Sequence, residues 1–263
     1  MALTAEGTRL TAEHRRAQAR VSVALVRDVL GLWRLLDPYR LDATRPTWAQ
    51  RVLDLIGRHR SKSERLALDY FTEFRRAELG PDLGGQRVPP VTEILENPWR
   101  DAAEVSLLVT GPSTVKRLSA AGLDPSDAAE RAGPGVAAAA LRHAAGGGRG
   151  ALDQAINADR LALGYQRVTG PKPCAFCAML ASRGPIYSSS TSGSTTMRGG
   201  KPDDYHDGCG CTAEPVYDVA TDLPASSQRF ADLWESVVVE NGLSGKEARN
   251  AFRRAHEAQL RAT

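Results

Sequence analysis

The sequence predicts a mainly α protein, with a helical N-terminal half, a small α+β module near the C-terminus and a helical tail. Two observations support this fold class. Apolar residues recur at helical spacing over most of the chain. The exception is the stretch from Pro171 to Tyr217, where short apolar pieces alternate with turn-forming residues and all four cysteines are found.

Composition indicates an ordinary folded protein. The 263 residues are 42% hydrophobic and 25% charged, and the formal net charge is +3. Charge alone gives no strong support for nucleic-acid binding, because basic and acidic residues are interspersed. No run approaches the roughly 18 apolar residues of a membrane span, and the first residues lack the apolar core of a signal peptide. We expect a protein made and kept in the cytoplasm, without membrane contact.

The N-terminal half reads as three helices. The first is predicted over 11–36, with Val23, Val26, Leu30 and Trp33 on its apolar face. The second is predicted from Pro46 to Ile56, where Gly57 ends it. The third begins at Ser61, which has capping-box spacing to Glu64.

Glycine and proline mark the expected interruptions. Residues 80–90 predict a loop, and a helix over 101–120 is expected to break at Gly111. Asp124 precedes Pro125 at a helix start, and an alanine-rich helix follows. The glycine run 146–150 is flexible by composition. We therefore expect a helical domain over 1–150, a metal-binding module over 151–222 and a helical tail over 223–263.

The last third of the chain has its own signals. The run SSSTSGSTTMRGG, residues 188–200, is expected to be a long exposed loop because it offers no side chains for a core. In the tail, Phe230, Leu233, Trp234 and Val237 share one helix side, and Ser244 begins the last helix. The four tryptophans are expected in the core.

The cysteines and one histidine predict a metal site. Cys174 and Cys177 form a CxxC pair, and after 28 intervening residues come His206, Cys209 and Cys211. Thiolate and imidazole donors at such spacings are typical of structural zinc. Five donors compete for four positions of one zinc ion; we favour Cys174, Cys177, Cys209 and His206, with Cys211 close behind. Four protein ligands leave no position for water, so the ion is expected to staple the fold rather than to catalyse a reaction.

Two other interpretations of the cysteines fit less well. A redox CxxC normally opens a helix after a strand in a βαβ unit, and no such pattern is visible. The residues Pro173 to Cys177 match half of the zinc deaminase signature. The other half needs an upstream His or Cys followed two residues later by Glu, whereas His143 is followed by two alanines.

The segment GYQRVTGPKPCAFCAMLASRGPIY, followed by YHDGCGCTAEPVY, resembles the C-terminal signature of phage Mu F-like minor head proteins. The resemblance covers roughly 159–217 and includes Arg167 before the CxxC pair. It implies a structural minor capsid protein of the virion head that is present in the host cytoplasm during assembly. It also implies association with the portal protein or the major capsid protein, with a role in head assembly, DNA packaging or delivery.

Two alternative functions are weighed against this one. A capsid maturation protease would need a nucleophile and a histidine base, but His14, His59, His143 and His256 are expected to be solvated, and no GxSxG elbow occurs. Contact with packaged DNA is a further alternative, for which the best residues are the arginines of the last helix: Arg249, Arg253, Arg254 and Arg261. Tyr165 and Arg167 are expected to pack against the zinc turn.

Overall fold

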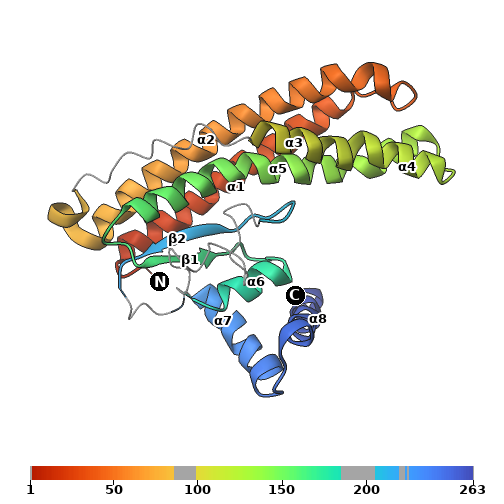
Figure 1. Cartoon of the computed structure of the whole chain (residues 1–263). Helices are drawn as coiled ribbons and strands as arrows, with labels where there is room; N and C mark the ends of the chain where they lie inside the picture. Colours follow the sequence, from red (N-terminus) through yellow and green to blue (C-terminus); the bar gives the residue numbers. More distant parts are fainter. Residues whose placement is uncertain (1, 86–98, 185–204, 219–222, 224, 263) are drawn as a thin grey trace.

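The computed structural model describes residues 2–85, 99–184, 205–218, 223 and 225–262. Three long helices form an elongated bundle, and a small sheet with the C-terminal helices lies along one side of it (Figure 1). The elements in chain order are α1 (Ala5–Trp33), α2 (Leu41–Gly84), α3 (Trp99–Leu108), η2 (Val109–Ser113), α4 (Thr114–Ala120), α5 (Pro125–Ala158), β1 (Gly164–Val168), α6 (Ala175–Ala181), β2 (Thr212–Val216), α7 (Ala225–Trp234), η4 (Glu235–Val239) and α8 (Gly245–Ala262). The predicted fold class, mainly α with a small α+β module, is confirmed.

Helix α1 starts earlier than the sequence indicated and buries a different face. Thr4 caps it by accepting a hydrogen bond from Gly7 N (2.9 Å), and the carboxylate of Glu78 on α2 accepts hydrogen bonds from Thr4. Leu25 and Val29 are fully buried, whereas Val23 is 71% exposed. The apolar face predicted through Val23 was therefore wrong. The sequence offers two overlapping stripes, and packing against α2 and α5 selects one.

Helix α2 is one helix where two were predicted. Gly57 lies inside it, and the buried side chains continue on both sides of that glycine, so Ser61 is an interior residue and not a cap. Burial against α1 and α5 outweighs the modest propensity cost of one glycine. The break comes later, at Gly80, whose φ of 77° kinks the helix. Of the loop predicted over 80–90, the residues from 86 on lie outside the described residues.

Helices α3 and α4 are joined through a π-helical turn. The break expected at Gly111 is instead the η2 segment, which continues the helix axis. A β-carbon at Gly111 would lie 3.1 Å from Val136 and 3.2 Å from Trp33, so glycine permits this close approach. The start of α5 agrees with the prediction, because Asp124 accepts a hydrogen bond from Ser126 N (2.8 Å).

The glycine run 146–150 was predicted to be flexible, and it is helical. It forms part of α5, where the missing side chains let the backbone approach α2. A β-carbon at Gly147 would lie 2.7 Å from the Arg60 carbonyl oxygen, and one at Gly148 would lie 2.7 Å from the Ser63 carbonyl oxygen. The glycines therefore form a close contact between two helices. The packing against α2 offsets the conformational entropy that glycine residues lose in a helix.

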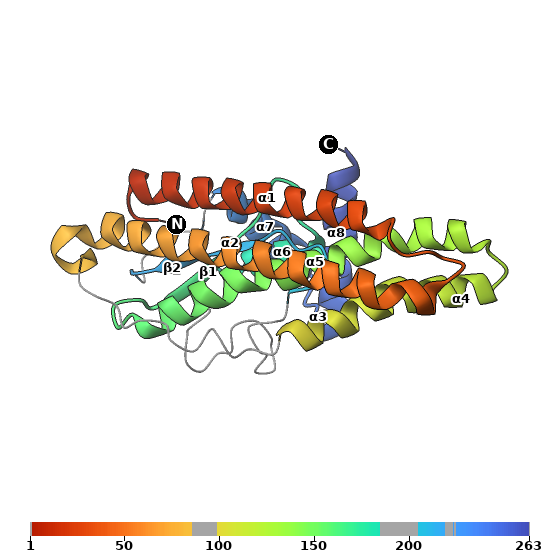
Figure 2. The ribbon, with the colours of Figure 1, turned by 90° about the horizontal axis from the view of Figure 1, so that it is seen from above.

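The direction of the helices follows from their contacts. Gln18 of α1 bonds to Ser63, and Thr4 bonds to Glu78, so α1 and α2 are antiparallel. Arg60 donates to the carbonyl of His143, and Arg75 pairs with Asp159, so α2 and α5 are parallel. Viewed from above, α1 and α2 lie side by side along the length of the bundle (Figure 2).

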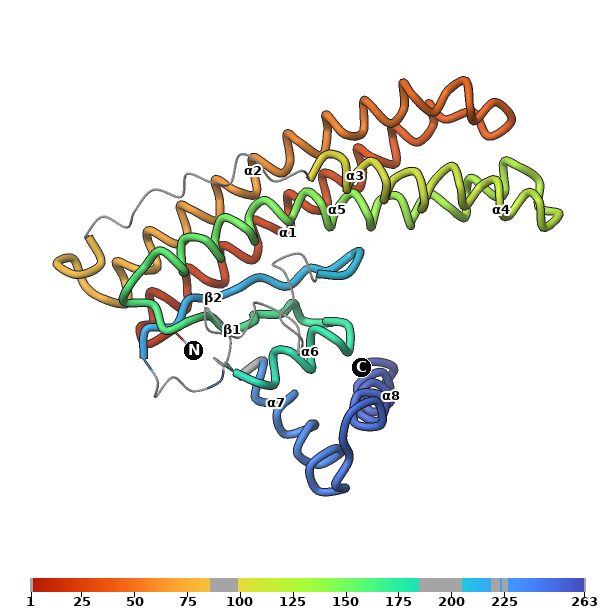
Figure 3. Tube along the Cα trace, viewed as in Figure 1, coloured from red at the N-terminus to blue at the C-terminus, as the bar shows by residue number. Residues whose placement is uncertain are grey.

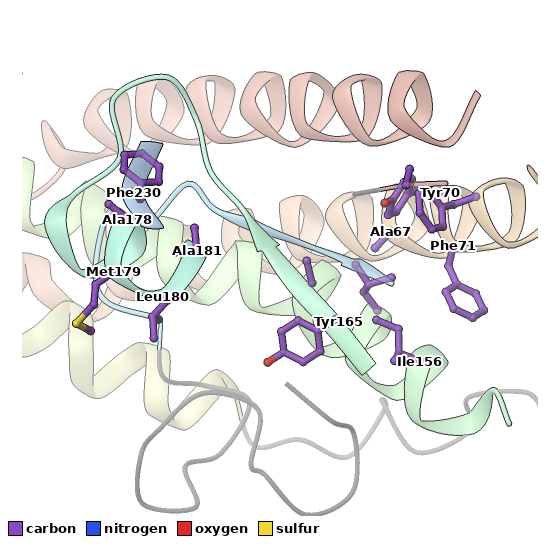
Figure 4. Close-up of a cluster of buried hydrophobic side chains, with 14 of the residues drawn as sticks. Ala67, Tyr70, Phe71, Ile156, Tyr165, Ala178, Met179, Leu180, Ala181 and Phe230 are labelled. Carbon is purple, nitrogen blue, oxygen red and sulfur yellow. The ribbon is translucent and has the colours of Figure 1, made fainter. Parts of the chain in front are cut away.

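The small sheet packs beneath one end of the bundle (Figure 3). Strands β1 and β2 are antiparallel, with Gly164 opposite Val216 and Val168 opposite Thr212, and every residue of both strands is buried. Tyr165 of β1 lies beside Ile156 of α5 in a core that also takes Phe71 of α2 and Leu180 of α6 (Figure 4). A second core fills the other end of the bundle around Trp48 and Ile56.

A buried ion pair joins the bundle to the chain that leaves it. Arg75 Nε donates to Asp159 Oδ2 at 2.7 Å, and Tyr217 also donates to Asp159 (3.1 Å). Nearby, Glu214 accepts hydrogen bonds from Thr11 (2.6 Å) and Gln166 (2.5 Å). Polar groups from α1, α2 and both strands therefore satisfy one another inside the protein.

Helix α5 crosses the boundary expected at residue 150, and residues from both sides of that boundary share a core. The division into 1–150, 151–222 and 223–263 stays a prediction about folding units. The tail is helical as expected, while the loop predicted over 188–200 lies outside the described residues. None of the described helices has the length and apolar character needed to cross a bilayer.

Candidate metal centre

The five predicted donors lie together in one cluster. Cys174 is the N-cap of α6 and accepts a hydrogen bond from Cys177 N (3.4 Å), so the helix start points both sulfurs to one side. The second group comes from the turn before β2, where Gly208 has a φ of 75° and Cys209 N donates to His206 O (3.1 Å). This left-handed glycine reverses the chain toward the CxxC pair.

The donor atoms form two triangles that share Cys177. Its Sγ lies 3.6 Å from His206 Nε2, 3.3 Å from Cys209 Sγ and 3.6 Å from Cys211 Sγ. Cys174 Sγ is 2.9 Å from His206 Nε2, and the sulfurs of Cys209 and Cys211 are 3.1 Å apart. Either triangle could hold a metal ion.

The chemistry of the cluster fits a metal site. All four cysteines are free, so no disulfide explains the gathering of sulfurs. Zinc–sulfur bonds of about 2.3 Å place tetrahedral sulfurs about 3.7 Å apart. The observed separations of 3.1 to 3.6 Å would reach that value with shifts of a few tenths of an ångström. The buried sulfurs of Cys177, Cys209 and Cys211 are therefore close enough to bind one ion, and the exposed donors Cys174 and His206 form the second triangle with Cys177.

The electrostatic setting differs among the thiols. The hydrogen bond with Cys177 and the nearby His206 lower the pKa of Cys174 to about 5. Hydrogen bonds from Cys177 and Cys209, together with the guanidinium groups of Arg167 and Arg149, hold the pKa of Cys211 well below its usual value. Since only the thiolate binds metal, these two sulfurs are prepared for ligation.

Two arginines and a tyrosine surround the buried side of the cluster. Arg149 and Arg167 both stack on the ring of Tyr205, with guanidinium carbons 3.8 and 4.1 Å from its centroid. Arg167 Nη1 donates to Cys211 Sγ (3.3 Å), and Arg149 Nη2 donates to Cys209 O (2.6 Å). The predicted packing of Arg167 on the cysteine turn is confirmed, whereas Tyr165 lies in the hydrophobic core.

Sequence reasoning missed Arg149 and Tyr205. Arg149 sits within the glycine run that composition assigned to a flexible segment, and Tyr205 directly precedes the ligand group. A single arginine among small residues of a predicted helix was the available signal for the first. Neither residue type is a metal ligand, so spacing rules for ligands do not detect them.

The cluster is attached to the bundle through α5. Gly208 N donates to Ala138 O (3.2 Å), and Arg142 pairs with Asp207 at 2.6 Å. Arg149 lies about two turns further along α5 than Arg142. It donates hydrogen bonds to the carbonyls of Cys209 and Cys211. Helix α5 therefore holds the second ligand group in place along its length.

The histidines outside the cluster are more buried than predicted. His14, His143 and His256 are 7%, 8% and 2% exposed, so the expectation that they are solvated was wrong. His14 stacks on Tyr70 with 4.4 Å between centroids, and His256 Nε2 lies 2.9 Å from Pro173 O. These aromatic rings fill core positions that helical periodicity assigned to polar faces.

Fold and site together define a mainly α protein that carries a cysteine–histidine cluster able to hold a metal ion. Residues 7–237 match the profile of the VG15 protein family, and the chain belongs to that family. It is similar to the "Gene 15 protein" of Mycobacterium phage D29, with 29% identity over 171 residues. That match covers 51% of this chain and 62% of the relative, so the chain spans less than two thirds of the relative's length. No solved structure matches. The family is a phage protein family.

Proposed function

We propose that the protein is a structural minor head protein of a tailed phage or prophage that associates with the portal vertex and assists head assembly, DNA packaging or delivery. The observation that carries the proposal is membership of the VG15 family, together with the similarity to a phage gene product. The Mu F-like pattern of Arg167, the CxxC pair and the HxxCxC group supports the same role. Its place is the virion head, and the host cytoplasm during assembly.

The bundle offers the surface for portal or capsid subunits. Val105 of α3 and Val109 of η2 are 61% and 58% exposed, and they lie one helical turn apart on the same face. Leu30 of α1 is also exposed. Large apolar side chains that remain exposed favour contact with another protein. We assign the portal-binding or capsid-binding role to this part of the chain.

The cluster is proposed to bind one structural zinc ion. Cysteine and histidine donors match the preferences of zinc, and four protein ligands would leave no position for a substrate. When bound, the ion cross-links the start of α6 to the turn before β2. Because this region has few apolar side chains of its own, the cross-link supplies much of its local stability.

Packaged DNA is a further proposed contact, through the last helix. Arg249, Arg253, Arg254 and Arg261 are all exposed on α8. Arg253 also pairs with Glu257 at 3.2 Å, which reduces its free charge. An affinity for DNA that falls steeply as salt rises, and that is lost in a variant with all four arginines changed to glutamine, is expected.

Maturation protease is the second candidate, because one histidine contacts a serine. His143 Nε2 lies 2.9 Å from Ser106 Oγ. However, Ser106 lies within α3, where it also donates to Ala102 O (2.8 Å), and Arg142 contacts both residues. A helix interior uses its own backbone N–H groups and offers no oxyanion hole. We therefore favour the structural role.

The test combines three measurements on the purified full chain: metal content, capture of the portal protein encoded by the same genome, and cleavage of its major capsid protein. We expect about one zinc per chain, portal capture and no cleavage. Val105→Asp/Val109→Asp should abolish capture, whereas Arg131→Asp, a charge change elsewhere on the bundle surface, should not. Capsid cleavage that disappears in His143→Ala would replace this proposal with the protease.

A further inference from the structure

Two cations beside the cysteine cluster have no carboxylate partner among the described residues. Arg167 is 1% exposed, and its Nε and Nη2 atoms have no hydrogen-bond partner in that part of the chain. Arg149 is half-buried, and its Nη1 atom is likewise without a partner there. Both guanidinium groups contact the face of Tyr205 instead. A ring face is a weak partner for two positive charges.

Buried charge is costly unless an opposite charge lies nearby. Elsewhere the protein follows this rule, since buried Arg75 pairs with Asp159 at 2.7 Å. Among the described residues, the thiols of Cys209 and Cys211 lie beside these two arginines and can carry negative charge. Arg167 Nη1 is 3.3 Å from Cys211 Sγ, and Arg149 Nη2 is 2.6 Å from the carbonyl of Cys209. Within the described part of the chain, the cluster is therefore the source of the counter-charge.

The net charge of a loaded cluster depends on its ligands. A divalent ion with three thiolates and one neutral imidazole carries a single negative charge, while the same ion with four thiolates carries two. Two guanidinium groups balance the second arrangement completely. They leave one buried positive charge uncompensated in the first.

We infer that the metal is bound by four thiolates, from Cys174, Cys177, Cys209 and Cys211, with Arg149 and Arg167 as the counter-charges and His206 outside the coordination sphere. The inference rests on the proposed metal site and changes its ligand set. The sequence analysis favoured His206, with Cys211 close behind. Burial and charge favour Cys211, which is 3% exposed and lies on the arginine side.

His206 has a different place in this arrangement. Its side chain is on the exposed side of the cluster, where Nδ1 lies 2.8 Å from Asp207 O. Nε2 lies 2.9 Å from Cys174 Sγ, the exposed sulfur of the set. The imidazole therefore contacts that ligand from the solvent side, and it acts as a positioning residue.

The first test replaces zinc by Co²⁺ in the full chain, because the thiolate-to-cobalt absorption grows with each bound sulfur. Cys211→Ser should lower this absorption and weaken zinc binding, whereas His206→Ala should leave the absorption intensity unchanged. Retained helical circular dichroism checks that each variant folds. If His206→Ala loses absorption or changes the ligand field while Cys211→Ser matches the parent, the assignment is overturned.

The second test addresses the arginines and does not require any ligand to be removed. We expect Arg167→Met and Arg149→Met to weaken zinc binding roughly 10- to 100-fold, as for other residues that support metal ligands. Lysine at either position should restore part of the loss because it keeps the charge. Arg131→Met, an exposed position on the same helix as Arg149, serves as the control. Unchanged zinc affinity in both methionine variants would contradict the counter-charge role.

Different results would contradict the metal site and the four-thiolate ligand set. A parent chain that takes up neither Co²⁺ nor Zn²⁺ removes the metal site itself. A parent chain that binds one ion through three sulfurs and His206 keeps the site and removes only the four-thiolate assignment.

Discussion

The helical bundle and the cysteine cluster are held together by different forces. The bundle buries large apolar side chains such as Trp48, Phe74 and Leu107, each fully inaccessible to solvent. The cluster buries three cysteines and Tyr205 as a separate small group with two arginines at its side. Apolar burial stabilises in proportion to area and needs no single residue, whereas a ligand cage fails with one lost donor. Substitutions should therefore be graded in the bundle and abrupt in the cluster.

We expect the largest effect from Cys177→Ser, because Cys177 belongs to both donor triangles. We expect loss of bound metal and a loss of several kcal/mol, up to about 10 kcal/mol, of local stability around 205–217. Hydrogen exchange should show fast exchange there and slow exchange in α1 and α2. Lys172→Ser, at an exposed position just before α6, is the control. Equal loss of protection in both regions would mean that they fold as one unit.

The next largest effect is expected where the two regions are joined. Asp159→Ala removes the carboxylate that pairs with the buried guanidinium of Arg75. This change should cost about 3–5 kcal/mol in the free energy of unfolding, measured by urea denaturation. Arg75→Met/Asp159→Ala removes both charges and should recover part of that loss. Asp101→Ala, at an exposed position of α3, should change little. A single variant no worse than this control would show that the ion pair does not hold α2 to α5.

The stability of the helical bundle should also depend on pH, because α1 buries His14. Burial lowers the pKa of His14 to about 4, against 6.5 for the free side chain. A base with a depressed pKa stabilises the fold fully above its unfolded pKa, and this contribution is lost as pH falls from about 6.5 toward 4. We expect up to about 3 kcal/mol of acid destabilisation from this residue.

The measurement is urea denaturation between pH 7.5 and 4 for the parent chain and His14→Phe. The variant should show a flatter dependence on pH, since phenylalanine keeps the stacking on Tyr70 and removes the titrating group. His59→Phe, where the side chain is partly exposed and close to Asp28, should flatten the curve less. Identical slopes for parent and His14→Phe would contradict the assignment.

The smallest effect concerns packing inside the bundle. Gly148→Ala would place a β-carbon against the Ser63 carbonyl, so we expect a loss of about 1–3 kcal/mol. Gly150→Ala meets nothing within 4 Å and should raise stability by up to about 1 kcal/mol through helix propensity. Thermal denaturation of the pair gives a matched comparison. The contact argument is wrong if both variants are stabilised.

The same contrast explains how much the sequence could predict. The candidate metal site depends on residue types with strong chemical preferences, so spacing alone singled out the five residues that the structure brings together. Helix boundaries depend on packing with distant segments, so Gly57 and the run at 146–150 were misread as interruptions. Arg149 combines both difficulties, because its role requires that α5 lie beside the cysteine turn. Likewise, nothing local in the sequence shows that the side chain of Val23 faces outward while that of Leu25 faces inward.

The contact of Gly147 and Gly148 with Arg60 and Ser63 has one more consequence. Long helices that pack through interchangeable alanine and leucine side chains can slip by a turn, about 5.4 Å, and still find apolar neighbours. A place where two backbones touch directly cannot slip, because any other alignment brings a side chain into the gap. The two glycines thus fix the axial alignment of α2 and α5. This alignment also sets how far the cysteine turn lies from the other end of the bundle.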